Sequence, residues 1–132
     1  MDRFLGKYEE LLYALFRFMF GLAFIFHGTQ KLFAWPGDAK AAELFSQRGL
    51  AGVIEVFGGA MIALGLWSAW AAFIASGTMA FAYFMRHAPD SFWPIVNRGE
   101  LAVLYCFAFL YIASRGSGRY SIEQAFSRRR LR

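Results

Sequence analysis

The stretch "LLYALFRFMFGLAFIFHGTQKLF", residues 11–33, decides the fold class, because it is long and apolar enough to cross a membrane as a helix. A spanning helix needs about 20 predominantly apolar residues. The polar exceptions here are Arg17 and a group near the end, where His27, Gln30 and Lys31 stand. Ionisable side chains cost about 3 kcal/mol or more at membrane depth unless they are paired or hydrated. We therefore expect these side chains to face protein partners rather than lipid.

Three further apolar blocks follow, at about residues 50–67, 70–86 and 97–114. The chain of 132 residues is 58% apolar and 20% aromatic, which exceeds the usual composition of a soluble domain. We therefore predict an all-α fold, an integral membrane four-helix bundle formed by a single domain over 1–132, with a basic tail over 115–132. Because the last three blocks are shorter than about 20 residues, a buried soluble bundle is the alternative.

Cationic residues predict the orientation of this bundle. Four spans place both termini on one side, and the two tails carry eight cationic residues against five on the other side. The positive-inside rule then places both termini in the cytoplasm. No small-residue cleavage site follows "MDRFLGKYEE", so the first helix is expected to be an uncleaved anchor. We expect the basic tail to meet anionic lipid headgroups of the bilayer, and not nucleic acid. The tail cations are Arg3, Lys7, Arg115, Arg119, Arg128, Arg129, Arg130 and Arg132, and the others are Lys31, Lys40, Arg48, Arg86 and Arg98.

Polar side chains from all four helices are expected to meet at one end of the bundle. Helices one and three run outward and helices two and four run inward, so late positions of the odd helices share a level with early positions of the even ones. In the fourth helix, helical spacing aligns Glu100 with Leu104, Phe107 and Tyr111. We predict a polar pocket at the periplasmic end. Its members are His27, Gln30, Lys31, Glu55, Tyr83, Arg86, His87, Asn97, Arg98 and Glu100.

Some of these residues also have a structural interpretation. Lysines and arginines at helix ends can extend to lipid headgroups, and tyrosines and tryptophans near helix ends can be interfacial anchors. Arg17 lies about two turns inside the first helix, where Glu9, Glu10 or a tyrosine of the last helix would pair with it. His27 and Glu55 have apolar residues on both sides, which favours a functional role for them.

Cysteine content limits the redox chemistry of this chain. Cys106 is the single cysteine, which excludes an internal disulfide, a CxxC pair and a thiolate metal cluster within one chain. The sequence also lacks a haem-attachment motif and a flavin or nicotinamide fingerprint. We therefore expect no covalently bound cofactor, and any redox role requires a partner protein that supplies electrons.

Three segments carry a resemblance to a known family. They are "RFMFGLAFIFHGTQKLF" (17–33), "GVIEVFGGAMIALGLW" (52–67) and "MAFAYFMRHAPDSFWPIVNRGELAVLYCFAFLYIA" (79–113). The arginine with HGxQK, the GxxExxGG and the NxGELAxLY patterns resemble the DoxX family of small four-helix membrane proteins. The resemblance implies a multi-pass protein of the bacterial inner membrane, in a family named for a subunit of a thiosulfate:quinone oxidoreductase. The family pattern falls on Arg17, His27, Gln30, Lys31, Glu55, His87, Asn97 and Glu100.

These observations together lead to a hypothesis about function, namely a membrane subunit of a quinone-linked oxidoreductase system. Quinone carbonyls accept hydrogen bonds from donors such as His27, Lys31 or Tyr83, and carboxylates and imidazoles can relay the protons that reduction takes up. The predicted catalytic residues are His27, Glu55, His87 and Glu100, and the predicted quinone-binding residues are Arg17, Gln30, Lys31, Tyr83 and Asn97.

Three alternatives remain open at this level. The chain could be a non-catalytic scaffold or assembly factor that holds a partner redox enzyme. His27 and His87 with Glu55 and Glu100 could hold a haem or a metal ion, since neutral imidazoles suit iron, copper and zinc. Transport of a small solute is the third. Small-residue stripes on the helices would also permit a homo-oligomer.

Overall fold

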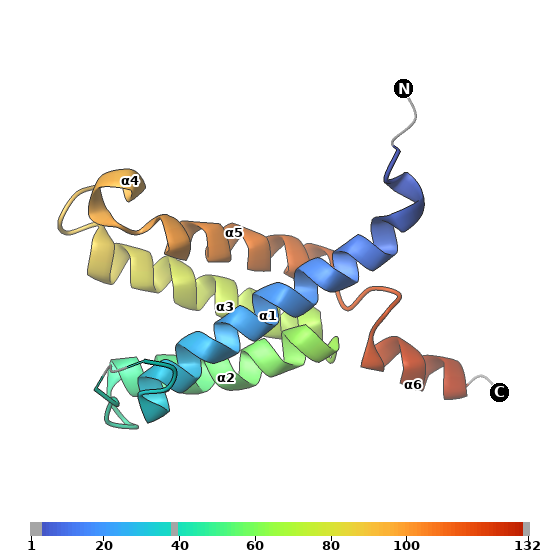
Figure 1. Cartoon of the computed structure of the whole chain (residues 1–132), viewed down its shortest axis with the longest axis horizontal. Coiled ribbons are helices and arrows are strands. Elements are labelled where there is room, and N and C mark those ends of the chain that lie inside the picture. The colour runs from blue at the N-terminus through green and yellow to red at the C-terminus, as the bar shows by residue number, and fades with distance from the viewer. Residues whose placement is uncertain (1–3, 38–39, 131–132) are drawn as a thin grey trace.

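The computed structural model describes residues 4–37 and 40–130, and within them every regular element is helical (Figure 1). Arg3, Arg132 and the side chain of Arg130, which were counted above among the tail cations, lie outside the described part. The longer helices are α1 (Glu9–Phe33), α2 (Gln47–Leu64), α3 (Ser68–Ala82) and α5 (Glu100–Arg115). The shorter elements are η1 (Gly6–Tyr8), α4 (Pro94–Asn97) and α6 (Ile122–Arg130). A π-helical turn, η2 (Tyr83–His87), continues α3.

Three segments of the described chain are long and apolar enough to cross a membrane: Gly6–Phe33, Gln47–Leu64 and Ser68–His87. The prediction of an all-α protein with membrane-spanning helices is therefore confirmed. The fourth predicted span is shorter, because α5 has 16 residues. At 1.5 Å per residue it is about 24 Å long, less than a hydrocarbon core of about 30 Å.

Capping residues place α2 three residues earlier than the predicted range 50–67. The Ser46 hydroxyl accepts a hydrogen bond of 3.0 Å from the Gly49 backbone N–H, which begins the helix. At the other end Gly65 adopts a left-handed conformation (φ 71°), and the helix ends at Leu64.

A local break shortens the fourth apolar block, which was predicted as one helix over 97–114. Asn97 ends α4 and its side-chain oxygen accepts a hydrogen bond of 2.7 Å from the Gly99 backbone N–H. Arg98 between them is left-handed (φ 61°). The chain therefore turns here, and α5 begins only at Glu100.

The basic tail contains a helix, α6, that sequence analysis did not anticipate. The Ser121 hydroxyl accepts a hydrogen bond of 3.2 Å from the backbone N–H of Gln124. A serine followed three residues later by glutamine is a capping-box signature. That signal was present in the sequence and would have indicated a helix start.

Helices α1 and α2 cross closely because glycines remove side chains from their contact. A Cβ atom added to Gly21 would lie 2.6 Å from both Gly59 O and Ala63 N. A Cβ atom added to Gly28 would lie 2.6 Å from Gly52 O. Such separations are far below van der Waals contact with backbone atoms. The close approach of α1 and α2 therefore requires glycine at these positions.

Aromatic and small side chains fill the space between α1 and the pair formed by α3 and α5, which lie side by side (Figure 1). The Phe24 and Phe109 rings are fully buried, with centroids 4.6 Å apart. On α3 the corresponding positions are alanines, including Ala72 and Ala75, which let α5 approach closely. This core keeps α1, α3 and α5 together below the level of the predicted polar pocket.

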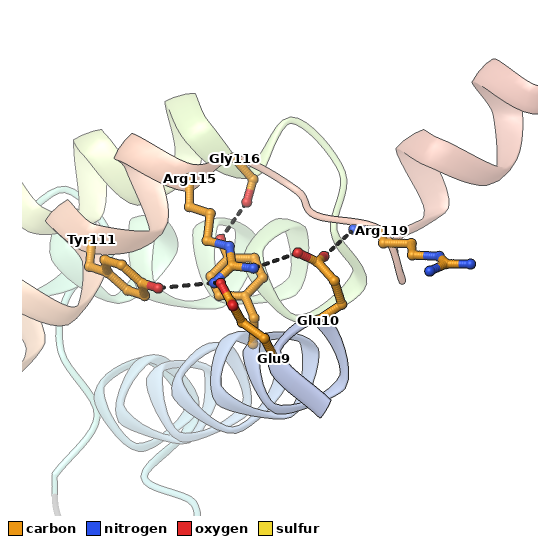
Figure 2. Close-up of polar contacts among 7 residues, drawn as sticks. Glu9, Glu10, Tyr111, Arg115, Gly116 and Arg119 are labelled. Atoms are coloured by element: carbon orange, nitrogen blue, oxygen red, sulfur yellow. Dashed lines mark hydrogen bonds and ion pairs between the residues drawn. The ribbon is translucent and has the colours of Figure 1, made fainter. Parts of the chain in front are cut away.

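An ion-pair cluster joins the start of α1 to the end of α5 (Figure 2). Arg115 contacts the Glu10 carboxylate at 2.5 Å and the Glu9 carboxylate at 3.4 Å. It also donates a hydrogen bond of 3.1 Å to the Tyr111 hydroxyl. Glu9, Glu10 and a tyrosine of the last helix were the partners expected for Arg17. In the structure these residues contact Arg115 instead. Because both carboxylates are partly exposed, the cluster contributes little stability per pair.

Candidate functional site

A buried ion pair between α1 and α2 lies at the centre of the predicted pocket. The Lys31 ammonium donates to Oε1 of Glu55. The side chain of Glu55 is 1% exposed and that of Lys31 is 27% exposed. The second carboxylate oxygen of Glu55, Oε2, is buried without a hydrogen-bond partner in the described chain. The pair therefore neutralises the buried charge and leaves one acceptor open.

A cavity of about 220 Å³, called the inner cavity below, adjoins this pair between α1, α3 and α5, and exposed Arg98 and Leu101 form part of its wall. The imidazole of His27 packs edge-on against the Tyr105 ring, with centroids 5.6 Å apart. Across residues 4–37 and 40–130, His27 makes no hydrogen bond. The polar part of the wall consists of His27, Lys31, Glu55, His87 and Arg98, and the aromatic part consists of Phe24 and Tyr105.

A second cavity of about 310 Å³ lies between α2 and α3. Its mouth carries two exposed arginines, Arg48 from α2 and Arg86 from η2. Lys31, Glu55 and His87 line this cavity as well as the inner one. The buried ion pair is therefore part of a wall shared by the inner cavity and this second cavity, which is called the outer cavity below.

Two of the predicted ligand-binding residues, Tyr83 and Asn97, hold the loop between η2 and α5 and line neither cavity. The Tyr83 hydroxyl donates to the Phe92 carbonyl. The Asn97 amide donates to the Ser91 carbonyl at 2.6 Å and to the Tyr83 hydroxyl at 3.2 Å. Nδ1 of His87 lies 3.1 Å from the Asn97 carbonyl. The structure thus places Tyr83 and Asn97 behind His87, where they fix its position.

Replacing Asn97 by alanine is expected to lower the free energy of unfolding by about 2 kcal/mol, because it leaves the buried Tyr83 hydroxyl and the Ser91 carbonyl each short of a hydrogen bond. Thermal unfolding in detergent, followed by circular dichroism, measures this loss. The control is Gln47→Ala, which truncates an exposed amide at the start of α2. Equal melting of Asn97→Ala and wild type would show that the loop is not held by this side chain.

Arg17 lies at the opposite end of the molecule from the two cavities. It stands 14 residues before Lys31 in α1, a separation of about 21 Å along the helix axis. Arg17 is 2% exposed, and its guanidinium donates to the carbonyls of Ile62 and Ala63, at the end of α2, and to that of Tyr120 at 2.9 Å. Arg17 therefore caps α2 and ties the tail to it.

Gln30 and Glu100 also lie away from the cavity walls. Gln30 donates a hydrogen bond of 3.1 Å to the Pro36 carbonyl and so holds the loop after α1. Glu100 is exposed at the first position of α5 and lines neither cavity. Tyr105, by contrast, lines the inner cavity, although the sequence interpretation treated tyrosines mainly as anchors. Its helical spacing from Leu101 and Ala102, which line the same cavity, is the signal that could have placed it there.

The metal alternative finds no ligand set in the part of the chain that the structure describes. No group of three or more histidine, cysteine, aspartate or glutamate side chains is placed there to hold a metal ion. In particular, exposed Glu100 does not join His27, His87 and Glu55 at the cavities.

Comparison with known proteins connects this arrangement to a family. The DoxX family model matches residues 12–88, which is more than half of the chain and includes Lys31, Glu55 and His87. The chain belongs to the DoxX family. This DoxX chain is also 38% identical over 130 residues to an uncharacterised protein of Haemophilus influenzae, covering 92% of this chain and 96% of that protein. No solved structure matches it. Family membership and three apolar helices together identify a membrane protein.

Proposed function

We propose that this DoxX protein is the membrane subunit of a quinone-linked oxidoreductase system, and that its inner cavity binds the ring of a quinone or a similar small molecule. The observation that carries the proposal is the composition of the cavity wall. His27, whose imidazole has no hydrogen-bond partner in the described chain, and Glu55, whose Oε2 is buried without one, line the same cavity as Phe24 and Tyr105. Aromatic walls with a few convergent polar groups are typical of small-molecule sites.

The residues of the cavity wall fit an uncharged ring with polar substituents. The Tyr105 ring forms the aromatic part of the wall beside His27, and the buried Phe24 ring supports it from behind, with centroids 5.7 Å apart. Lys31 is already paired with Glu55, so that pair adds no net charge to the cavity. His27 can donate to one ligand oxygen or accept from it, because a neutral imidazole has one nitrogen of each kind.

A bound quinone would supply the capacity to take up two electrons and two protons. The chain's own residues bind and orient the ring and hold protons beside it. His27 and Glu55 line the inner cavity. Lys31 and His87 line both cavities, and exposed Arg48 lines the outer one. This arrangement supports a proton route between the ring and the surface through titratable groups.

The proposal includes a place for the protein in the cell. When α5 is a short fourth span, the start of α1 and the C-terminal tail lie on the same side of the membrane. The excess of cationic residues in the two tails favours the cytoplasm as that side. The membrane would be the bacterial inner membrane, and the cavities would then open near its periplasmic face. Because the sequence has no electron-carrying motif, a partner redox protein must supply the electrons.

The test is equilibrium binding of a short-chain ubiquinone to the full chain in lipid nanodiscs, with empty nanodiscs as the baseline. We expect saturable binding that is weakened about tenfold in His27→Ala, as loss of one hydrogen bond predicts. Thr29→Ala is the matched control, since Thr29 is on the same helix but lines neither cavity. If the wild type binds no quinone, or if His27→Ala binds it normally, the assignment fails. Retention of a partner enzyme without any quinone would favour the scaffold alternative.

A further inference from the structure

The open hydrogen-bonding position of Glu55 is an acceptor, which restricts what can bind beside it. Lys31 donates to Oε1, and the adjacent ammonium favours the ionised form of the carboxyl group, in which Oε2 carries no proton. An ionised carboxylate oxygen accepts hydrogen bonds and cannot donate them. Glu55 is buried, and Oε2 has no partner in residues 4–37 and 40–130. A buried acceptor of this kind requires a group that brings a donor, and among ring ligands of the quinone type only the hydroxyl form supplies one.

His87 presents a second acceptor to the cavities. Its Nδ1 lies 3.1 Å from the Asn97 carbonyl oxygen, which only accepts hydrogen bonds. Nδ1 must therefore carry the proton, and in the neutral ring Nε2 is the acceptor. The Asn97 side chain, held by Ser91 and Tyr83, keeps this carbonyl in place.

Lys31 and Arg98 on the same wall have less need of a ligand, and His27 can accept a hydrogen bond as well as donate one. Lys31 is paired with Glu55, and Arg98 is an exposed residue whose guanidinium can also be hydrated. A quinone carbonyl brings only acceptor oxygens, so it would leave Glu55 Oε2 unsatisfied, whereas a ring hydroxyl satisfies it. We infer that the inner cavity binds the hydroxyl form of the ring, a quinol or another phenol, in preference to the quinone. This inference rests on the proposed function and specifies its ligand.

The ligand side of the inference is tested by three compounds that share one ring. The full chain in nanodiscs is titrated with a short-chain ubiquinol, its dimethyl ether and the corresponding ubiquinone, each corrected for partition into empty nanodiscs. We expect the quinol to bind about tenfold or more tightly than the other two, because a hydrogen bond to a charged acceptor is lost in both. Equal binding of the quinol and its ether would overturn the inference without any need for a protein variant.

The protein side is tested by Glu55→Gln, which keeps the shape of the side chain but adds a donor in place of one acceptor. The variant is expected to lose the preference for the quinol, while binding of the quinone stays equal or improves. Glu43→Gln, the same substitution at an exposed carboxylate, should keep the wild-type preference. A quinol preference that survives in Glu55→Gln would exclude Glu55 as its origin.

Failure of this inference is distinguishable from failure of the proposed function. If none of the three compounds binds above the empty-nanodisc baseline, the quinone-linked function itself fails. If all three bind with similar affinity and His27→Ala weakens them all, the cavity is a ring site but Glu55 does not select the hydroxyl form.

Discussion

Replacing Gly59 by alanine is expected to destabilise the protein by about 3 kcal/mol, whereas the same replacement at the adjacent Gly58 is expected to be neutral or slightly stabilising. A Cβ atom at position 59 would lie 2.7 Å from Gly21 O and 2.9 Å from Cγ1 of Ile25. The first of these is a backbone atom, so α1 and α2 must separate to relieve the contact, and overpacking of this kind costs about 1–3 kcal/mol or more. In the described chain, no atom outside the neighbouring backbone of α2 lies within 4 Å of a Cβ atom at position 58.

The two variants form a matched pair, because they add the same methyl group to neighbouring positions of one helix. Alanine gains up to about 1 kcal/mol over glycine in a helix interior, so Gly58→Ala measures that gain alone. Thermal unfolding of both variants in the same detergent gives the difference. Separation of α1 from α2 would also move Lys31 away from Glu55, so we expect Gly59→Ala to weaken ring binding as well. Similar melting temperatures for the two variants would show that the close helix crossing does not contribute to stability.

Sequence analysis anticipated part of the site from the depth at which residues lie along antiparallel helices. Late positions of one helix and earlier positions of the next meet because the chain reverses direction, and this holds whatever the exact helix bounds. His27, Lys31, Glu55 and His87 were grouped on this basis, and the structure brings all four to the inner cavity. Level alone was not sufficient, because it also grouped Gln30, Tyr83, Asn97 and Glu100, which line neither cavity.

The face of α5 could not be assigned in the same way. The sequence aligned Glu100, Leu104, Phe107 and Tyr111, yet in the structure all four are exposed. The buried side of α5 contains Tyr105 and Phe109, one or two positions along. In a membrane helix both faces are apolar, so hydrophobic periodicity does not distinguish the side that faces protein from the side that faces lipid.

Tyr83, Asn97 and Arg17 show a second limit of sequence reasoning. Polar side chains were expected to bind a ligand or one another, but these three bind mainly backbone carbonyls. A helix end and a loop at membrane depth both leave backbone groups without partners, and lipid cannot satisfy them. Which backbone groups are left depends on caps and breaks, such as the left-handed Arg98, that hydropathy does not reveal.

Replacing Lys31 by methionine is expected to lower the free energy of unfolding by about 3 kcal/mol, because it leaves the Glu55 carboxylate buried without a counter-charge. Breaking a buried pair by removing one partner costs about 3–5 kcal/mol, and the 27% exposure of Lys31 places the loss near the lower limit. The double variant Lys31→Met with Glu55→Gln removes the charge as well and should recover most of the loss. Unfolding in detergent, at a pH where carboxylates are ionised, measures both.

The control is Lys40→Met, which removes the same charge from an exposed position outside the cavities and should unfold like the wild type. A non-additive result in this double-mutant cycle is the signature of a direct interaction between the two side chains. If Lys31→Met and the double variant lose equal stability, the carboxylate does not depend on Lys31 and must be stabilised in another way. Recovery in the double variant would show that Lys31 stabilises the fold by neutralising Glu55. The second carboxylate oxygen, Oε2, then remains the group without a protein partner in the described chain.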